Sequence, residues 1–131
     1  MLYTMIIVTA LSCNPQPEVS RKFFSAIWTV ETSQATDGPS WGDGGRSRGP
    51  LQISRAAWID SGIPGSWSDC DRLAYAKLVL ESYLDRYCIE RRLGHMPTDQ
   101  DRARIWNGGP NGYKKKSTLL YWSKVQRLLN Q

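Results

Sequence analysis

Two carboxylates in the first half of the chain are candidates for acid–base chemistry. Glu31 follows Ile27 and Trp28 in an apolar helical pattern, and Asp43 lies between two glycines. Apolar surroundings raise the pKa of a carboxylate, whereas the free backbone N–H groups of a glycine-rich turn favour its charged form. Two carboxylates separated in this way can cleave a glycosidic bond, one by donating a proton and the other by stabilising or attacking the sugar cation.

Each carboxylate also has an ordinary structural interpretation. A glutamate in the last turn of a helix often points into solvent, and an aspartate in a glycine turn is common for conformational reasons. Asp37, in the segment TDG, is a second candidate for the aspartate role. The spacing and environment of these residues therefore leave the catalytic and structural interpretations open.

The elements that must position these side chains follow from helical periodicity and turn residues. Apolar residues at helical spacing predict a first helix over residues 18–32, with Ser20 as its N-cap. Residues 33–50 are rich in glycine and proline, which leaves room for a small β-hairpin with Asp43 at its turn. Glu31 is thus expected at a helix end and Asp43 on the adjoining hairpin.

Further helices are predicted along the rest of the chain. A short helix over residues 54–62 begins at Ser54, a typical N-cap, and ends at Gly62. The longest helix is predicted over residues 69–93 and stops at Gly94. Its apolar residues recur at three and four positions, which is typical of a core helix: they are Leu73, Ala76, Leu80, Tyr83, Leu84 and Tyr87.

The C-terminal part is predicted to hold two more helices. Thr98 and Asp101 resemble a capping box that opens a helix, and the segment NGGPNG at residues 107–112 ends it. Ser117 or Thr118 is expected to cap the last helix, whose apolar face consists of Leu119, Trp122, Val125 and Leu129. The predicted fold class is α+β and helix-dominated, with about five helices and one small β-hairpin.

Composition limits the classes of function. The 131 residues fit a single domain, and 17 Lys and Arg against 12 Asp and Glu give a net charge of +5. This charge would attract anionic polymers. The only basic run is Lys114 to Lys116, and no nucleic-acid-binding module is recognisable, so nucleic acid is not an expected partner. We expect a monomer.

The first 17 residues form an apolar segment distinct from the domain predicted over residues 18–131. The run from Met1 to Cys13 is shorter than the roughly 20 residues that a membrane-spanning helix needs, and it lacks a basic start. It is compatible with the remnant of an export signal, and ALSC resembles a lipoprotein cleavage site at Cys13. We therefore expect an exported protein, with lipid anchoring at Cys13 and a surface-packed or disordered N-terminus as alternatives.

The cysteines do not form a disulfide framework or a metal site. Three cysteines cannot pair completely. Cys70 and Cys88 fall near opposite ends of the longest predicted helix, roughly 27 Å apart at 1.5 Å per residue, so they are not expected to pair. With His95 as the only histidine, no zinc spacing is present. We expect no metal.

Four stretches of the chain resemble the invertebrate-type, or destabilase-like, lysozymes. They are WTVETS, GDGG, GPLQISRAAWIDSGIPG and ARIWNGGPNGYKKKSTLLYWSKVQ, in this order and covering roughly residues 20 to 127. The resemblance implies a lysozyme-like fold in which Glu31 is the general acid and Asp43 the second carboxylate. It also implies hydrolysis of the β-1,4 bond between N-acetylmuramic acid and N-acetylglucosamine in peptidoglycan, with chitin as a secondary substrate and no cofactor.

Aromatic and amide side chains near these motifs are candidates for the walls of a saccharide groove. Pyranose rings stack on flat side chains, and amide groups hold their substituents. We select Trp41, Gln52, Asn107 and Tyr113. Each also has a structural interpretation, as loop packing, a strand residue or a helix end.

The sequence departs from the family pattern at three positions. Ser61 and Tyr113 stand where animal members carry cysteine, and Trp106 stands where the family normally reads His. The fold is therefore expected to rely on packing and hydrogen bonds, as in a microbial relative. The isopeptidase activity credited to some relatives is not transferred, because His95 lies outside the matching motifs.

Other functions remain open at this point. A lytic transglycosylase also uses a glutamate acid but closes the muramic acid on itself, without adding water. A non-catalytic peptidoglycan- or chitin-binding protein would keep the groove. An inhibitor or interaction protein would bind neither polymer.

Overall fold

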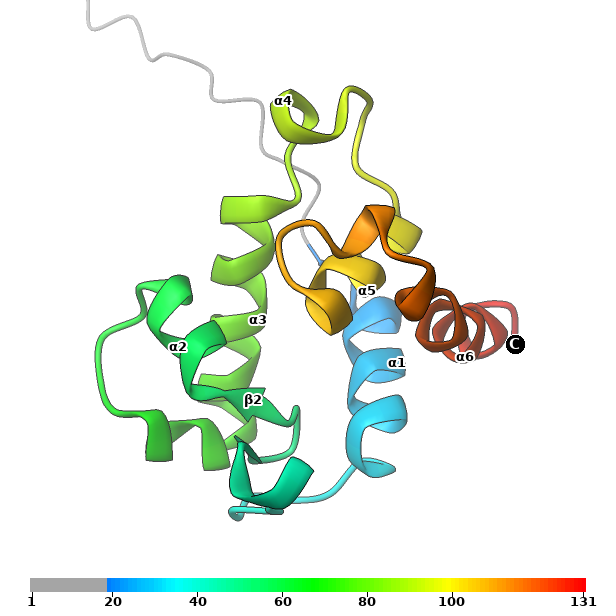
Figure 1. Ribbon diagram of the computed structural model, residues 1–131. Coiled ribbons are helices and arrows are strands. Elements are labelled where there is room, and N and C mark those ends of the chain that lie inside the picture. The colour runs from blue at the N-terminus through cyan, green and yellow to red at the C-terminus, as the bar shows by residue number, and fades with distance from the viewer. Residues whose placement is uncertain (1–18) are drawn as a thin grey trace, which may run out of the picture.

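A computed structural model describes residues 19–131, in which helices predominate and a small two-stranded sheet lies toward the lower end of the view (Figure 1). The helices are α1 (Arg21–Thr32), α2 (Arg55–Ser61), α3 (Leu73–Tyr87), α4 (Glu90–Leu93), α5 (Asp99–Gly108) and α6 (Leu119–Leu129). Short 3₁₀ segments are η1 (Asp43–Gly45), η2 (Trp67–Asp71), η3 (Gly112–Lys114) and η4 (Lys116–Thr118). The predicted helix-dominated α+β class is confirmed, with six α-helices in the described range where five were expected.

The N-terminal predictions lie outside the described residues. These are the apolar segment over residues 1–17, its boundary with the domain, and the lipid site at Cys13. Between residues 19 and 131, no helix combines the length and the apolar character that crossing a membrane requires.

Helix α1 begins and ends with local capping contacts. The Ser20 hydroxyl accepts the backbone N–H of Phe23, which satisfies one of the free donors in the first turn. Ser33 ends the helix in the left-handed conformation, with its N–H bonded to the carbonyl of Thr29. The predicted cap and C-terminal end are confirmed, so Glu31 lies in the last turn.

The β-hairpin differs from the prediction in the position of its turn. Strands β1 (Ser47–Arg48) and β2 (Ile53–Ser54) pair antiparallel, so residues 49–52 form the connection between them. Asp43 lies in the preceding turn, which an isolated bridge between Gly42 and Ser47 closes. The glycine-rich segment thus makes two successive turns, and Asp43 belongs to the first.

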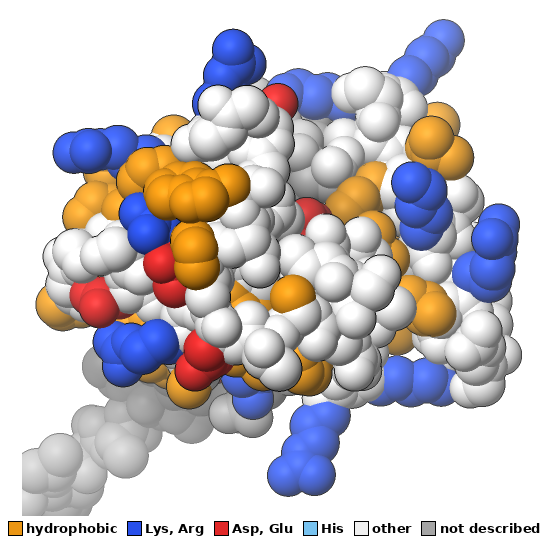
Figure 2. All heavy atoms as spheres, turned by 90° about the horizontal axis from the view of Figure 1, so that it is seen from below, with side chains coloured by type: hydrophobic (Ala, Val, Ile, Leu, Met, Phe, Trp, Pro, Cys, Tyr) orange, Lys and Arg blue, Asp and Glu red, His pale blue; other side chains and the backbone are white. Residues whose placement is uncertain are grey.

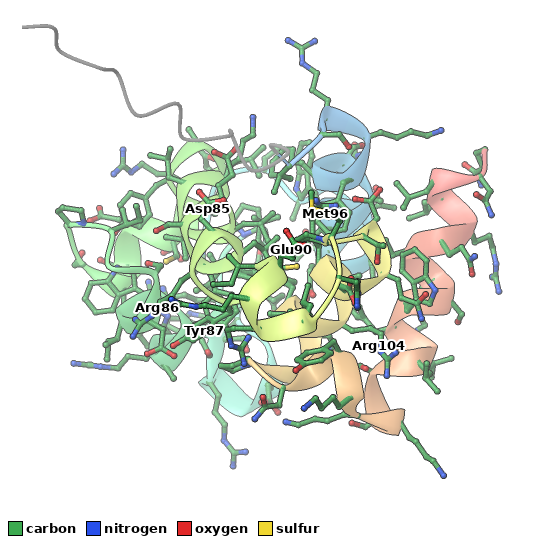
Figure 3. The ribbon with its side chains drawn as sticks, turned by 90° about the horizontal axis from the view of Figure 1, so that it is seen from above. Asp85, Arg86, Tyr87, Glu90, Met96 and Arg104 are labelled. Carbon is green, nitrogen blue, oxygen red and sulfur yellow. The ribbon has the colours of Figure 1, made fainter. Side chains whose placement is uncertain are left out.

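The helix predicted over residues 69–93 is divided into three pieces. The first piece is η2, and α3 begins at Leu73 because the carboxylate of Asp37 accepts its backbone N–H at 2.8 Å. The backbone leaves the helical conformation at Cys88, with φ −99° and ψ 70°, and the short α4 follows at the upper end of the molecule (Figures 1 and 3). Gly94 ends α4 with φ 80°, as predicted for the stop at this glycine.

Helices α5 and α6 are joined by a compact connection. The predicted capping box is confirmed, since the Thr98 hydroxyl accepts the N–H of Asp101 and the Asp101 carboxylate accepts that of Thr98. Thr118 precedes α6, but its side chain does not cap that helix. Instead its hydroxyl, fully buried, donates to the carbonyl of Gly112 and accepts from Arg104, which Figure 3 labels beside this connection.

Helix α3 supplies the largest share of the hydrophobic core, and it packs against α2, α5 and η2. Helix α1 packs on α6, which also contacts α5. Leu119, predicted on the buried face of α6, is instead 45% exposed. Cys70 and Cys88 are both buried and free, and Ser61 is buried with its hydroxyl donating to the carbonyl of Trp58 at 2.6 Å. Packing and hydrogen bonds therefore hold the described part of this fold.

Candidate active site

Glu31 and Asp43 line one cleft, of about 340 Å³, between the end of α1, the hairpin and α5. Seen from below, the surface is hollowed between two lobes and acidic side-chain atoms are visible inside the hollow (Figure 2). Gln52 and Asn107, two of the predicted wall residues, are also in the lining. The other lining residues are Ser47, Ile53, Ser54, Ala57 and Trp106.

Two side-chain hydrogen bonds fix the end of α1 against the loops that follow it. The Thr32 hydroxyl donates to the carbonyl of Pro50 in the hairpin turn at 2.7 Å. The indole of Trp28 donates to the carbonyl of Ala35 at 2.9 Å. Both donors lie within one turn of Glu31, so the carboxylate is held relative to the hairpin by contacts that a local helix pattern does not reveal.

The half-buried carboxyl of Glu31 is the acidic group in the cleft whose pKa is shifted. Burial raises the pKa of Glu31 from 4.5 to about 7, and a hydrogen bond from the Tyr121 hydroxyl acts in the opposite direction. That hydroxyl, which belongs to α6, lies 2.7 Å from Oε1 of Glu31. Burial raises the pKa of Tyr121 well above its usual value, so the phenol remains a proton donor. The predicted rise in the pKa of Glu31 is confirmed.

Asp43, which also lines the cleft, occupies a different environment. Its side chain is exposed, and its backbone has φ 49°, in the left-handed region that non-glycine residues rarely adopt. Gln52, also in the lining, has φ 53°. Strained backbone of this kind is concentrated at functional sites, where the surrounding structure maintains it. The cleft therefore combines a half-buried acid with a solvated carboxylate.

Gln52 is fixed by backbone contacts below the Asp43 turn. Its side-chain amide donates to the carbonyls of Ser40 and Gly49. The side chain lies directly against Gly42, where an added Cβ would be 1.8 Å from the Gln52 Oε1. Glycine at position 42 is thus required for this amide to occupy the floor of the turn.

Asp37, the alternative candidate for the second carboxylate, forms its hydrogen bond outside the cleft. Its carboxylate accepts the N–H of Leu73 at the start of α3, and it does not line the cleft. Of the two candidates for the second carboxylate, only Asp43 shares the cleft with Glu31.

Two predicted wall residues lie outside the cleft lining. Trp41 is 56% exposed and stands against Trp67 in an edge-to-face arrangement, with ring centroids 5.9 Å apart. Tyr113 packs on the core, and its hydroxyl donates to the carbonyl of Arg92 at 3.3 Å. The structure therefore brings together Glu31, Asp43, Gln52 and Asn107, and leaves Trp41 and Tyr113 apart from them.

Sequence reasoning did not assign two residues of the site. Trp106, on α5, lines the cleft and packs edge-to-face on Tyr83, with centroids 5.7 Å apart. Its position directly before Asn107 was a usable signal. Tyr121 contacts Glu31 although the two residues are 90 positions apart in the sequence, and no local pattern predicts that contact.

A larger hollow, of about 630 Å³, lies on another face of α1. Thr29, in its lining, is two residues before Glu31 and therefore about 200° around the helix. The lining contains Arg21 and Lys22 but no Asp or Glu side chain, so it lacks a buried side-chain acid like Glu31 in the cleft.

Within residues 19–131, no cluster of three or more His, Cys, Asp or Glu side chains is placed to hold a metal ion. His95 pairs through Nε2 with the Asp101 carboxylate at 2.8 Å, and neither residue lines the cleft. The ionisable side chains in the cleft lining are those of Glu31 and Asp43.

Fold and cleft together place the chain in the lysozyme class. The crystal structure of Aeromonas hydrophila PliI in complex with Meretrix lusoria lysozyme matches with a TM-score of 0.71 and 37% sequence identity, over 82% of this chain and 88% of that chain. The lysozyme of M. lusoria is also similar in sequence, 38% identical over 112 residues that cover 84% of this chain and 90% of the relative.

The chain belongs to the invertebrate-type lysozyme family, as its motifs predicted. Invertebrate-type lysozyme 6 of Caenorhabditis elegans is 34% identical over 95 residues, which are 65% of this chain and 69% of that protein. Lysozyme 1 of Crassostrea virginica is 38% identical over 110 residues, but these span 82% of this chain and only 59% of the relative. No family model matches the chain.

Proposed function

We propose that this protein is a muramidase that hydrolyses the β-1,4 bond between N-acetylmuramic acid and N-acetylglucosamine in peptidoglycan. The observation that carries the proposal is the shared cleft of two unlike carboxylates, a half-buried Glu31 with a pKa of about 7 and an exposed Asp43. Family membership supports the reaction class, and chitin is the secondary substrate. The proposal includes export of the protein to a compartment where it meets peptidoglycan, with lipid anchoring at Cys13 as an alternative to release.

Glu31 would act as the general acid. Near neutral pH, a substantial fraction of its carboxyl groups carries the proton that must reach the glycosidic oxygen. Asp43 would stabilise the positive charge that develops on the sugar ring as the bond to the leaving oxygen breaks. Water then completes the hydrolysis and yields a new reducing end.

Mass spectrometry of digested peptidoglycan tests this function. Hydrolysis adds one water and predicts fragments with reducing muramic acid ends. Anhydro-muramic ends would identify a lytic transglycosylase, because that reaction adds no water. A protein that binds the wall and releases no fragments would be a non-catalytic binding protein.

Activity is expected to fall as the pH rises through about 7. Glu31 loses its proton in this range because burial raises its pKa from 4.5 to about 7. The rate of peptidoglycan clearing, measured from pH 4 to 9 at constant ionic strength, should therefore show its basic limb near neutrality. A limb close to the 4.3 or so of a free glutamate would contradict the assignment of Glu31 as the acid.

Trp41 is proposed as an outer stacking site for the polysaccharide. The Arg48 guanidinium lies 4.3 Å from the Trp41 ring centroid and forms two hydrogen bonds to Asp71, at 2.9 and 2.7 Å. Trp67 supports the same ring from the side. The indole is thus held in place while more than half of its surface is open to a sugar ring.

Replacing Trp41 with alanine is expected to raise KM for long wall fragments by about 3- to 10-fold, the loss of one stacking contact of roughly 1 kcal/mol. Trp41→Phe should retain much of the affinity. Leu120→Ala, which removes a 68% exposed side chain on α6, is the matched control and should leave KM unchanged. An unchanged KM for Trp41→Ala on substrates of every length would rule out the stacking role.

A further inference from the structure

A single hydrogen bond joins the candidate acid to the C-terminal helix. The Tyr121 hydroxyl of α6 donates to Oε1 of Glu31 at 2.7 Å, and the two helices pack on each other. Among residues 19–131, this is the one hydrogen bond made by the Glu31 carboxyl. Among the described residues, Tyr121 is thus the residue of α6 that hydrogen-bonds the Glu31 carboxyl.

The geometry distinguishes the two oxygens of the carboxyl group. Oε1 accepts the phenol, and a phenol that is half-buried and bonded in this way has no reason to release its proton at neutral pH. A protonated carboxyl that keeps this contact carries its proton on Oε2. The oxygen that can deliver a proton to substrate is then defined before the substrate binds.

We propose that Tyr121 is a positioning residue that fixes the Glu31 carboxyl, assigns the transferable proton to Oε2 and stabilises the carboxylate left after proton transfer. The inference rests on the proposed role of Glu31 as general acid. It gives α6 a part in catalysis that the cleft lining does not reveal, since Tyr121 is absent from that lining. Tyr121 itself exchanges no proton with the substrate.

The pKa of Glu31 can report the Tyr121 hydrogen bond, because few ionisable side chains line the cleft. The other ionisable group in the cleft lining is Asp43, and α5 contributes the uncharged Trp106 and Asn107 to it. Arg21 and Lys22 of α1 line the other hollow, at the opposite end of that helix. A hydrogen bond to the charged form of a carboxyl lowers its pKa, so loss of the Tyr121 hydroxyl is expected to raise the pKa of Glu31 further.

The test is a titration of Glu31 by ¹³C NMR in protein labelled at the glutamate carboxyl carbons. Glu31→Gln removes one signal and so assigns it. Tyr121→Phe is expected to move the titration midpoint of that signal upward by about half a unit or more. Tyr75→Phe is the matched control, because it also removes a hydrogen-bonded tyrosine hydroxyl, but one that lies outside the cleft, where it donates to the carbonyl of Pro64 and accepts from the Trp58 indole. In Tyr75→Phe the titration midpoint of Glu31 should equal that of the wild type.

Kinetics provide the second measurement. Tyr121→Phe is expected to lower kcat by about 10-fold with little change in KM, and to shift the basic limb of the pH profile in the same direction as the NMR midpoint. Tyr75→Phe should leave the position of this limb unchanged. An unchanged or lower midpoint in Tyr121→Phe, with a wild-type pH profile, would overturn the proposal.

A second way of changing the Tyr121 hydroxyl and a measurement that does not depend on activity make the test of Tyr121 decisive. If Tyr121→Phe does not fold, 3-fluorotyrosine placed at position 121 strengthens the donor without changing the packing, and it is expected to lower the Glu31 midpoint. An unmoved midpoint would then count against the proposal. The NMR readout is independent of activity, so a wrong assignment of Glu31 as the acid would appear as an active Glu31→Gln variant, whereas a wrong role for Tyr121 would appear as an unmoved midpoint.

Discussion

Replacing Glu31 with glutamine is expected to reduce peptidoglycan hydrolysis by about 10³-fold, within the range of roughly 10² to 10⁴ that a general acid contributes. Glutamine keeps the shape of the side chain and can still accept the Tyr121 hydroxyl, but it has no proton to transfer. The loss should therefore appear in kcat, measured on soluble wall fragments. Glu81→Gln is the matched control, since Glu81 lies on α3 in an ion pair with Lys77.

The same substitution is expected to stabilise the fold at alkaline pH. Burial raises the pKa of Glu31 from its ordinary value of 4.5 to about 7 in the folded chain, so the folded state binds more protons than the unfolded state between these values. The stability of the wild type accordingly decreases as the pH rises from about 4.5 through about 7. Above this range the unfavourable burial of the charge is fully present, and glutamine removes it.

The size of this gain can be measured by urea unfolding at two pH values. At pH 8 the Glu31→Gln variant should exceed the wild type by about 1 to 3 kcal/mol, an estimate discounted from the full pKa shift because the side chain is only half-buried. At pH 4 the difference should vanish. Equal stabilities at both pH values, or an active variant, would contradict the assignment of Glu31 as a buried acid.

The parts of the site that sequence could predict are those set by local pattern or by family motif. The Ser20 cap and the apolar stripe of α1 were readable, so the position of Glu31 in the last turn followed directly. The glycines around Asp43 indicated a turn with exposed backbone, and the amide side chains of Gln52 and Asn107 indicated groups that could hold sugar substituents. These four residues meet in the cleft.

The parts that sequence could not predict depend on contacts between distant residues. The start of α3 is set by the Asp37 carboxylate 36 residues away. Beyond the end of α3, the Arg92 guanidinium donates to the carbonyls of Tyr87 and Pro110, which binds α4 to another loop. Helical periodicity continues through both boundaries, so it predicted one long helix. The Tyr121 contact to Glu31 joins residues 90 positions apart, so local sequence patterns do not predict it either.

The placement of Asp43 also depends on such contacts, because the hairpin that follows its turn is docked on η2. Arg48 of β1 bonds Asp71, and the N–H of Gly38 donates to the Asp71 carbonyl at 2.8 Å. Gly49, in the hairpin turn, packs directly against the backbone of η2. A Cβ at this position would lie 2.1 Å from the carbonyl oxygen of Cys70. The backbone of η2 therefore sets the position of one wall of the cleft.

Replacing Gly49 with alanine is therefore expected to destabilise the protein by about 3 to 5 kcal/mol, at the upper end for single substitutions. The left-handed φ of 81° contributes about 1 to 2 kcal/mol of this. The rest comes from the collision with the Cys70 carbonyl, which is backbone and cannot rotate away. Urea unfolding at fixed pH measures the sum.

Gly94→Ala separates the two contributions. Gly94 has nearly the same φ, 80°, and an added Cβ there meets no atom within 4 Å, so only the conformational part of about 1 to 2 kcal/mol remains. Equal destabilisation by the two substitutions would mean that the hairpin is free to move away from η2. In that case the position of Asp43 relative to Glu31 would depend on the substrate, because the fold alone would not fix this wall of the cleft.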